Sequence, residues 1–526
     1  MKLFKNFIKL TASAAVMMLL GACGSEDAPE VTLASKGNMV PDNSIMAIKV
    51  MPEQIWNKSF GVRGSEAYEL WEYGKDQLTY LLNGMGDFGK VAKSVLDDPA
   101  NLGVNLKEPL VVSYSADVAK LLSRNPQMEM TVVALLDDSG AFVKVFDSLM
   151  DLAKKNGEAE ITREASGSFT YYKMSKSGEP FFLDLGVTPE SAVLRLSINT
   201  PDSAKDSKAS MSNLFAAGGP DDKEGIKAFH DSKGDAAVWI NLDEIVSSLI
   251  PAIKEKAPKD ARAIITEVAS FFKGASAVAD INFKDGETVM TANVLGSEKI
   301  NELVQRYFKK ASDKYFTEIP DNYAVVLNAA VKDLPGLVDI ISSVPGVKEE
   351  LRKAGIDKKV LAGGPGVITM AVDMLEEYYE SDAKYVICLD ADRTLWNFLE
   401  NKISDKADEL YEDFYVKDDK GLQYRDGSLC LMDENAYGDI QYIDYYGSFA
   451  DSNYAQYIED GGILFMLRQI PQLAETAYET GVEACAIAPT ETMTGLKATI
   501  VMSDRYSNML EQFAEYFAKE IRRAIR

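Results

Sequence analysis

The chain has 526 residues, 46% of them hydrophobic, and its formal net charge at pH 7 is −25. This length corresponds to roughly three or four compact units, and the composition is that of a globular protein able to bury large cores. A surface this acidic repels the phosphate backbone of nucleic acids and anionic lipid headgroups. Nucleic acid is therefore excluded as a partner, and cationic or neutral ligands are favoured.

The first 22 residues have the pattern of a secretory signal peptide. Lys2, Lys5 and Lys9 precede an apolar run from Leu10 to Ala22, which ends in small residues. The alternative is a membrane-spanning helix, but the uninterrupted run is shorter than the ~20 residues that a span needs. We therefore expect a cleaved signal at residues 1–22.

The junction Leu20-Gly21-Ala22-Cys23 resembles a bacterial lipobox. The resemblance implies cleavage before Cys23, acylation of that cysteine, and a mature protein held at a membrane by lipid rather than by a span. The removed segment contains three lysines and no acidic residue, so its loss changes the formal net charge from −25 to −28.

A polar tether, residues 23–39, follows the lipobox. Glu26 and Asp27 resemble the acidic export signal of surface lipoproteins in Bacteroidota. This resemblance implies a protein anchored in the outer membrane and exposed at the cell surface; without export across that membrane, the anchored protein faces the periplasm. The alternative is that the two acidic residues only solvate the tether.

Two passages open with the same three residues, Pro41-Asp42-Asn43 and Pro320-Asp321-Asn322. Pro fixes φ, and Asp and Asn hydrogen-bond to the nearby backbone, so the phrase predicts a turn. Each turn is followed by an apolar run of strand length, a helical passage, two further strand runs and an amphipathic helix. The order strand–helix–strand–strand–helix is therefore predicted for both passages.

A related pattern, without the Pro-Asp-Asn turn, starts at Gly234 and again at Gly461. The chain would then contain four βαββα units in two matched halves, residues 40–318 and 319–526. Internal repeats of this kind outweigh local propensity, and the unit is most of a split βαβ, the ferredoxin-like arrangement. We expect an internally duplicated α+β protein with mainly antiparallel sheets and helices on one face.

Insertions separate the predicted units. The first half gains extra hairpins and a polar loop at residues 199–225, and the second half has an insertion at 411–457 that is rich in Tyr and Asp. Tyr rings cover sugars or side chains, and carboxylates accept hydrogen bonds from hydroxyl or ammonium groups. The alternative is a sheet in which Tyr side chains pair across strands. The candidate ligand-binding residues are Tyr424, Tyr437, Tyr442, Asp444, Tyr445 and Tyr446.

The sequence lacks the usual motifs of catalysis and metal binding. His230 is the one histidine of the chain, which excludes a site with several histidine ligands, and packing is its simplest role. The glycines of "NGMGDFGK", residues 83–90, match G-x-G-x-x-G but follow a helical pattern, so we expect a corner between two helices rather than a dinucleotide site. No catalytic residue, metal or cofactor is predicted.

Three cysteines lie within apolar runs of the mature chain: Cys388, Cys430 and Cys485. They lack CxxC spacing, and an odd number does not suggest a disulfide framework. Small apolar side chains of this kind are commonly buried. We expect three buried free thiols.

The lipobox, the acidic tether and the Pro-Asp-Asn openings together resemble a family of Bacteroidota lipoproteins that carry a domain of unknown function. The resemblance carries no catalytic or binding residues. Three functions stay open. The repeats and the missing catalytic motifs favour a non-enzymatic module that binds a glycan or a protein, or assists assembly. The others are a carboxylate-dependent hydrolase acting on glycans and a structural subunit of an outer-membrane complex.

Overall fold

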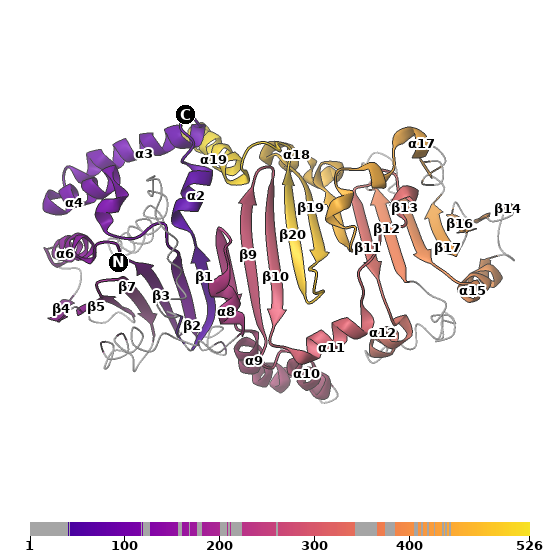
Figure 1. Cartoon of the computed structure of the whole chain (residues 1–526), viewed down its shortest axis with the longest axis horizontal. Coiled ribbons are helices and arrows are strands. Elements are labelled where there is room, and N and C mark those ends of the chain that lie inside the picture. The colour runs from indigo at the N-terminus through magenta and orange to yellow at the C-terminus, as the bar shows by residue number, and fades with distance from the viewer. Residues whose placement is uncertain are drawn as a thin grey trace. The chain divides into compact units, whose positions relative to one another are not determined.

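The computed structural model describes the chain from residue 40 to residue 525. Within that range the residues outside the description are 42, 117, 119–126, 156–159, 168, 176–180, 200–207, 209–210, 212–223, 259–260, 342–365, 374–383, 404–408, 412–413, 418–419, 426, 434–435, 437–438 and 441–442. The predicted signal peptide, the tether and most of the polar loop are not among the described residues. The mixture of helices and antiparallel strands confirms the α+β class (Figure 1). None of the described helices is long and apolar enough to cross a membrane.

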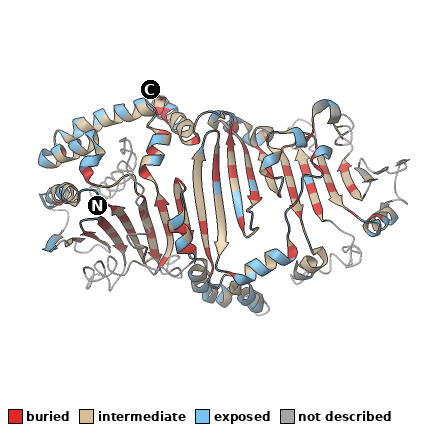
Figure 2. Cartoon of the chain, in the orientation of Figure 1, coloured by how far each residue is buried: buried red, intermediate tan, exposed pale blue. Residues whose placement is uncertain are grey.

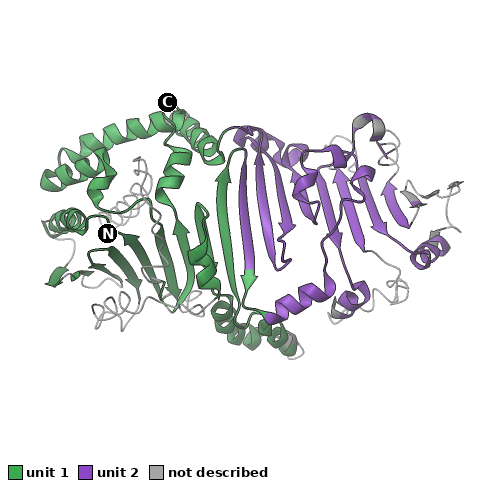
Figure 3. Cartoon of the chain, in the orientation of Figure 1, with its two compact units in different colours: residues 1–285, 294–297, 507–526 green, residues 286–293, 298–506 purple. Residues whose placement is uncertain are grey.

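The chain forms two compact units, which Figure 3 distinguishes by colour. Unit 1 comprises residues 1–285, 294–297 and 507–526, and unit 2 comprises residues 286–293 and 298–506. These units do not follow the two halves of the sequence. Helix α11 (Glu298–Tyr307), from the first half, belongs to unit 2, whereas the C-terminal helix α19 (Met509–Ile525) belongs to unit 1.

Unit 1 contains an antiparallel sheet with the strand order β4-β5-β6-β7-β3-β2-β1-β8-β9. The strands are β1 (Ser44–Val50), β2 (Leu110–Ala116), β3 (Met128–Leu135), β4 (Glu160–Ser166), β5 (Phe169–Ser175), β6 (Phe181–Val187), β7 (Ser191–Ile198), β8 (Ala236–Ile240) and β9 (Ser276–Lys284). The β4–β5 and β6–β7 hairpins confirm the extra hairpins predicted for the first half.

The helices of unit 1 begin and end where local sequence signals favour it. They are α2 (Pro52–Ser59), α3 (Glu66–Leu82), α4 (Gly86–Asp97), η2 (Pro99–Leu102), α6 (Ser139–Lys155), α8 (Glu224–Asp231), α9 (Leu242–Lys256), α10 (Ala261–Ser270) and α19. The Ser65 hydroxyl caps α3 by accepting a hydrogen bond from the Tyr68 amide at 3.1 Å. The turn between α3 and α4 confirms the predicted helix corner at the glycine motif.

Helices pack on both faces of the unit 1 sheet, so the prediction of helices on one face is wrong. On β7, Val193 clusters with Ile226 and Phe229 of α8. The next residue, Leu194, packs with a cluster that includes Met150 of α6. Successive side chains of a strand point to opposite faces, so α6 and α8 cover opposite sides. The near-continuous apolar runs of these strands require cover on both faces.

Unit 2 contains an antiparallel sheet with the strand order β10-β20-β19-β18-β11-β12-β13-β17-β16-β15-β14. The strands are β10 (Glu287–Leu295), β11 (Val325–Ala330), β12 (Val367–Asp373), β13 (Lys384–Asp390), β14 (Glu409–Tyr411), β15 (Phe414–Lys417), β16 (Lys420–Arg425), β17 (Ser428–Asp433), β18 (Gly462–Met466), β19 (Val482–Pro489) and β20 (Gly495–Met502). Residues 287–293 of β10 belong to this unit.

The helical elements of unit 2 are short. They are α11, η3 (Phe316–Glu318), α12 (Leu334–Ile341), α15 (Arg393–Ile403), α17 (Ile443–Tyr446), η5 (Phe449–Asp451), η6 (Ala455–Tyr457), η7 (Leu467–Gln469) and α18 (Pro471–Thr480). Helix α18 starts at a proline and ends before Gly481, whose φ of 74° is left-handed. This is the usual asymmetry of helix termini, because Pro needs no amide partner at the start and Gly adopts the left-handed cap.

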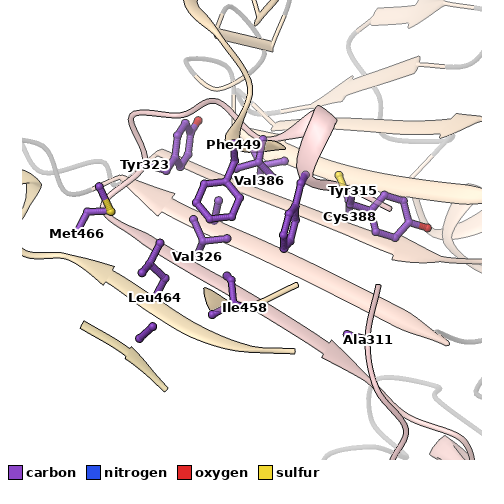
Figure 4. Close-up of a cluster of buried hydrophobic side chains, with 14 of the residues drawn as sticks. Ala311, Tyr315, Tyr323, Val326, Val386, Cys388, Phe449, Ile458, Leu464 and Met466 are labelled. Atoms are coloured by element: carbon purple, nitrogen blue, oxygen red, sulfur yellow. The ribbon is translucent and has the colours of Figure 1, made fainter. Parts of the chain in front are cut away.

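The main core of unit 2 lies on one face of its sheet. Val326, Val386 and Leu464, each fully buried on a different strand, cluster with Tyr315 and Phe449 from the segments that cover this face (Figure 4). Figure 2 shows buried positions alternating with less buried ones along the strands, as the twofold period of a strand requires.

The strand order of unit 2 repeats that of unit 1 when β11 to β19 are matched with β1 to β9. Equivalent positions of the two sheets also form equivalent backbone hydrogen bonds. The Asn241 amide donates to the Ile45 carbonyl at 2.9 Å in unit 1, and the Met466 amide donates to the Ala324 carbonyl at 2.7 Å in unit 2. Both bonds connect the C-terminal end of β8 or β18 to the segment that follows a Pro-Asp-Asn phrase.

A buried side-chain donor occupies the same place on β1 and β11. Lys49 Nζ donates to the carbonyls of His230 at 3.1 Å and Ser232 at 2.6 Å. Asn328 Nδ2 donates to the carbonyl of Ile458 at 3.1 Å. In both units a polar side chain of the central strand thus holds the segment that leads into the next strand, β8 or β18.

Lys49 makes the stability of unit 1 depend on pH. Its side chain is buried, and burial lowers the pKa of Lys49 from 10.5 to about 8, although the carboxylates of Asp280 and Asp231 oppose the shift. Between those two pKa values the unfolded chain binds more protons than the folded chain, so stability rises with pH. We expect urea titrations to show that the free energy of unfolding rises by about 2 kcal/mol from about pH 7.5 to about pH 9.5. We expect the Lys49→Met variant to lack this rise. An unchanged rise in Lys49→Met would contradict this assignment.

Cys388 and Cys430 form a disulfide between the paired strands β13 and β17, with their Cα atoms 4.2 Å apart. The expectation of three free thiols is therefore wrong, and of these three cysteines Cys485 alone is free. The disulfide could not be predicted from the spacing of the cysteines, because they are 42 residues apart in sequence, with part of the Tyr/Asp insertion between them. Only the register of β13 against β17 brings them together.

Candidate functional site

Tyr424, one of the six candidate residues, is part of a hydrophobic cluster. It lies on β16 and stacks on Trp396 of α15, with ring centroids 4.9 Å apart and ring planes at 25°. The Arg393 guanidinium carbon lies 5.5 Å from the centroid of the same tyrosine ring. Leu429 belongs to the same cluster. This environment matches the alternative reading, in which the tyrosine packs within the sheet region.

The other candidate residues fall in or near α17. Tyr445 is 83% exposed, and Asp444 and Tyr446 belong to the same helix, although the description does not extend to their side chains. Tyr437 and Tyr442 lie outside the described residues, as does Cys23. The backbone of α17 leads directly into Gly447, whose amide donates to the Ile443 carbonyl at 2.8 Å.

The segment after α17 forms one wall of a pocket in unit 2. The pocket has a volume of about 460 Å³. Its lining comes from the second Pro-Asp-Asn turn, the η5–η6 segment, the end of β18 with the η7 turn that follows it, and β19. The lining residues are Asp321, Asp451, Ser452, Asn453, Tyr454, Met466, Arg468, Gln469 and Glu483.

Backbone contacts fix the first wall of the pocket. The Phe449 amide donates to the Ile319 carbonyl at 2.7 Å, and Pro320 forms a β-bridge with Ser448. The Phe449 ring packs edge-on against Phe316, with centroids 4.9 Å apart. These contacts hold the Pro-Asp-Asn turn against the η5 segment and place both of their carboxylates in one pocket.

Gly447 allows this close approach of the turn. Its φ of 101° lies in the region that favours glycine. A Cβ at this position would lie 3.2 Å from Oδ2 of Asp321, tighter than an ordinary contact. The glycine therefore leaves room for the Asp321 carboxylate at the pocket wall.

Asp321 is an exposed residue whose carboxylate forms no ion pair with a described residue and is hydrogen-bonded by its own backbone amide. Partial burial raises the pKa of Asp321, and the nearby charge of Asp451 raises it further, against the opposing effect of its own backbone amide. Asp451 accepts a hydrogen bond from the Ser448 hydroxyl at 2.9 Å. The negative charges of Asp321 and Asp451 thus repel each other, and neither carboxylate forms an ion pair with a described residue.

Other lining residues belong to a hydrogen-bond network around Glu483. One carboxylate oxygen accepts from Arg468 at 3.0 Å, and the other accepts from Arg505 at 3.0 Å and from the Tyr454 hydroxyl at 2.8 Å. Burial, followed by the hydrogen bond to Glu483, raises the pKa of Tyr454 to about 12. The Arg468 guanidinium also lies 4.8 Å from the centroid of the Tyr478 ring. One carboxylate shared by two guanidinium groups leaves this network with a formal charge of +1, and Nε of Arg468 is buried without a hydrogen-bond partner.

Gln469 connects the network to the Pro-Asp-Asn turn. With its amide nitrogen turned toward the backbone, the side chain donates to the carbonyls of Tyr323 at 3.0 Å and Asn322 at 3.2 Å. The turn that carries Asp321 is therefore held from both sides, by η5 on one side and by η7 on the other.

The network is particular to unit 2. When the two sheets are matched by register, the position of Arg468 corresponds to Asp243 and that of Glu483 corresponds to Ala275. The Ala275 side chain is buried and cannot accept a hydrogen bond. The two sequence halves keep the same framework but differ here, and comparison of the halves position by position was the signal that could have identified this site.

The site is suited to holding a polar or cationic group. No group of three His, Cys, Asp or Glu is placed to bind a metal within the described part of the chain. Carboxylates accept hydrogen bonds, and the tyrosine ring and Met466 provide apolar surface. The pocket thus combines a few oriented polar groups with an apolar patch, as small-molecule sites do.

Comparisons with known proteins do not assign a function to the site. No family model matches the chain, and no curated protein matches it. Among solved structures, the DNA polymerase III subunit beta from Borrelia burgdorferi, in complex with a natural product, is similar at 11% sequence identity. The match covers 68% of this chain and 82% of that chain, with a TM-score of 0.07. A likeness at that TM-score carries no argument about fold or function.

Proposed function

We propose that this protein is a lipid-anchored envelope protein that binds a ligand without catalysis, and that the unit 2 pocket is its binding site. The observation that carries the proposal is the lining of one pocket: it combines Arg468 and Glu483, which belong to an Arg–Glu–Arg network, with two carboxylates that form no ion pair with a described residue. Preorganised polar groups of this kind bind ligands at a low cost in ordering.

The envelope location is supported by two independent features. The Leu20-Gly21-Ala22-Cys23 junction resembles a lipobox, and the Cys388–Cys430 disulfide is of a kind that persists in oxidising compartments and is rare in the cytosol. We propose the outer membrane as the site of anchoring and the cell surface as the compartment. The membrane contact is through acyl chains on Cys23, and the soluble partner is a glycan or a protein.

We also propose that the fold arose by internal duplication of a pair of βαββα, ferredoxin-like units. The matched strand orders of the two sheets support this history, as do the matched amide bonds to Ile45 and Ala324. The equivalent buried donors Lys49 and Asn328 support it further. In this account the first half retained the framework alone, and the second half acquired the pocket.

The proposal is tested with a ligand panel and matched variants. The panel contains neutral oligosaccharides, amino sugars and short peptides, and binding to the mature chain is measured by calorimetry. We expect Asp451→Asn and Tyr454→Phe to weaken binding about tenfold, since each removes a hydrogen bond to or beside a charged group. The control is Glu491→Gln, an exposed carboxylate on the β19–β20 hairpin that does not line the pocket.

The same panel separates the pocket from the Tyr/Asp insertion. Replacing Tyr442, Tyr445 and Tyr446 together with Ala is expected to weaken binding more than it lowers the melting temperature, because α17 leads into the pocket wall and Tyr445 is exposed. Binding that is unchanged in every pocket variant would contradict the proposed site. Lost stability with unchanged binding would assign the three tyrosines a packing role alone.

One observation favours a second candidate function, a carboxylate-dependent hydrolase acting on glycans. Asp321 has a raised pKa and lies beside a second carboxylate, and glycosidases use two carboxyl groups whose surroundings separate their pKa values. Turnover of an oligosaccharide that Asp321→Asn abolishes would establish this candidate. Binding without turnover, across the same panel, supports the binding module.

A further inference from the structure

The sheet of unit 2 has a second face, opposite the core that Figure 4 shows. On β11, Val326 points into that core, so its neighbours Val325 and Leu327 point to the second face. The register of the strands extends the position of Leu327 into a row across the sheet. From β10 to β13, this row is Met290, Ala498, Ile487, Ile463, Leu327, Met370 and Ile387.

Two parallel rows flank this one, and we call the three rows together the open face. The flanking rows are Thr288, Ile500, Cys485, Phe465, Val325, Val372 and Tyr385 on one side, and Ala292, Leu496, Pro489, Ala329, Ile368 and Leu389 on the other. None of the side chains in the three rows is Asp, Glu, Lys or Arg, although these four types make up 26% of the chain. Loss of charged residues distinguishes the centre of a protein interface from ordinary surface.

The open face leaves large aliphatic side chains in contact with water. Met290, Met370, Ile487 and Leu496 come from four different strands, and their exposed fractions range from 36% for Met370 to 57% for Leu496. At the β13 end of the face, Leu389 packs against the cluster around Trp396 of α15. A contiguous apolar face of this kind, exposed over several strands, marks a surface that contacts another molecule.

We propose that the open face is the contact surface between two copies of this chain. Seven strands at a spacing of about 4.8 Å, with about 15 Å of strand length, give the face an area of about 500 Å². Two copies in contact therefore bury about 1,000 Å² in total, which reaches the lower limit for a specific interface. The proposal is independent of the ligand pocket and goes beyond the proposed function.

Charge favours a second copy as the occupant. Each copy has a formal net charge of −25, so two copies repel each other except through a surface that carries no charge. The open face is such a surface, and its burial leaves no carboxylate without solvent. A cationic partner would instead be recognised through acidic side chains.

The geometry of a sheet face also suits contact with an identical face. Two sheets pack about 10 Å apart, with the side chains of their inner faces interdigitated. A twofold axis brings the same patch of both copies together, so one row of apolar side chains serves both partners. The unbranched side chains of Met290 and Met370 adapt their shape to such a contact.

The mass of the chain in solution tests the proposal. The protein is the mature chain with Cys23→Ala, which carries no acyl chains, and light scattering measures its mass between about 1 µM and about 200 µM. We expect the mass to rise with concentration from that of one chain toward that of two, with a micromolar dissociation constant. A chain that stays monomeric over the whole range would overturn the proposal.

Variants then locate the contact. Leu496→Lys and Met370→Lys each place a charge on the open face, and each is expected to raise the dissociation constant at least about tenfold, because the charge loses its solvent in the dimer. The control is Leu473→Lys, since Leu473 is 43% exposed on α18 and lies outside the open face. A lysine reduces the net negative charge, so a weaker dimer cannot result from added repulsion.

Two further measurements complete the test. The melting temperature at about 1 µM, where the chain is monomeric, is expected to be the same in the variants and their parent, which assigns the effect to association rather than to folding. A dimer that both open-face variants retain would overturn the proposal. A monomeric chain that binds phosphatidylcholine vesicles, and loses this binding in Leu496→Lys, would also overturn it and assign the face to a lipid surface.

Discussion

Replacing Cys23 with Ala is expected to move the protein from the membrane fraction to the soluble fraction. The lipobox resemblance implies that Cys23 carries the acyl chains. Each buried CH₂ of such a chain contributes about 0.8 kcal/mol to membrane binding. A formal net charge of −25 gives no attraction to anionic lipid. Fractionation followed by immunoblotting measures the change.

Cys485→Ala is the matched control for this experiment, because it removes a free cysteine that no lipobox precedes. It is expected to leave the protein in the membrane fraction. Protease treatment of intact cells then separates the two orientations: cleavage places the wild-type protein at the cell surface, and protection places it facing the periplasm. A Cys23→Ala protein that stays membrane-bound would contradict the lipid anchor.

Loss of the Cys388–Cys430 disulfide is expected to lower the free energy of unfolding of unit 2 by about 4 kcal/mol. The crosslink joins residues 42 apart in sequence, and closing a loop of that length restricts the unfolded chain by about this amount. The two strands are paired in the folded sheet, so the bond connects positions that the fold already brings together. Urea unfolding of the Cys388→Ala, Cys430→Ala double variant measures the loss.

Two controls accompany the disulfide experiment. Cys485→Ala removes a thiol from the same unit without removing a crosslink and is expected to change stability much less. Addition of a reductant to the unfolding titration is expected to lower the stability of the wild-type chain and leave the double variant unchanged. A wild-type chain with the same stability under oxidising and reducing conditions would show that the crosslink contributes nothing.

Much of the framework could be predicted from local sequence pattern. The apolar run after Pro320-Asp321-Asn322 is strand β11, and the helix corner at the glycine motif joins α3 to α4. These features depend on residues that are near each other in sequence. The prediction of helices on one face failed because it assumed a half-exposed sheet, whereas residues such as Val193 and Leu194 are covered on both sides.

Neither the disulfide nor the pocket could be predicted from local sequence pattern, and the reason is the same for both. Cys388 meets Cys430 only through the register of two strands separated by an insertion. Glu483 meets Arg468 because β19 pairs with β18 beside η7, and Asp321 joins them through a bridge between Pro320 and Ser448. Each is a contact between distant segments that depends on strand order and register rather than on spacing.

The insertion that composition singled out contributes residues to the pocket. The density of Tyr and Asp marked residues 411–457, and the pocket residues Asp451 and Tyr454 lie inside that range. The described residues among the six candidates do not line the pocket. Tyr424 packs on Trp396 in a hydrophobic cluster, because an aromatic ring on a strand next to a helix gains more from burial than from exposure to solvent.

A crystal structure of the mature chain with glucosamine tests the central claim most directly. The claim predicts electron density for the sugar in the unit 2 pocket, in contact with lining residues such as Asp451 and Tyr454. It also predicts no such density in crystals of Asp451→Asn grown under the same conditions. Density for the sugar only at other surfaces, or an unchanged position in Asp451→Asn, would contradict it.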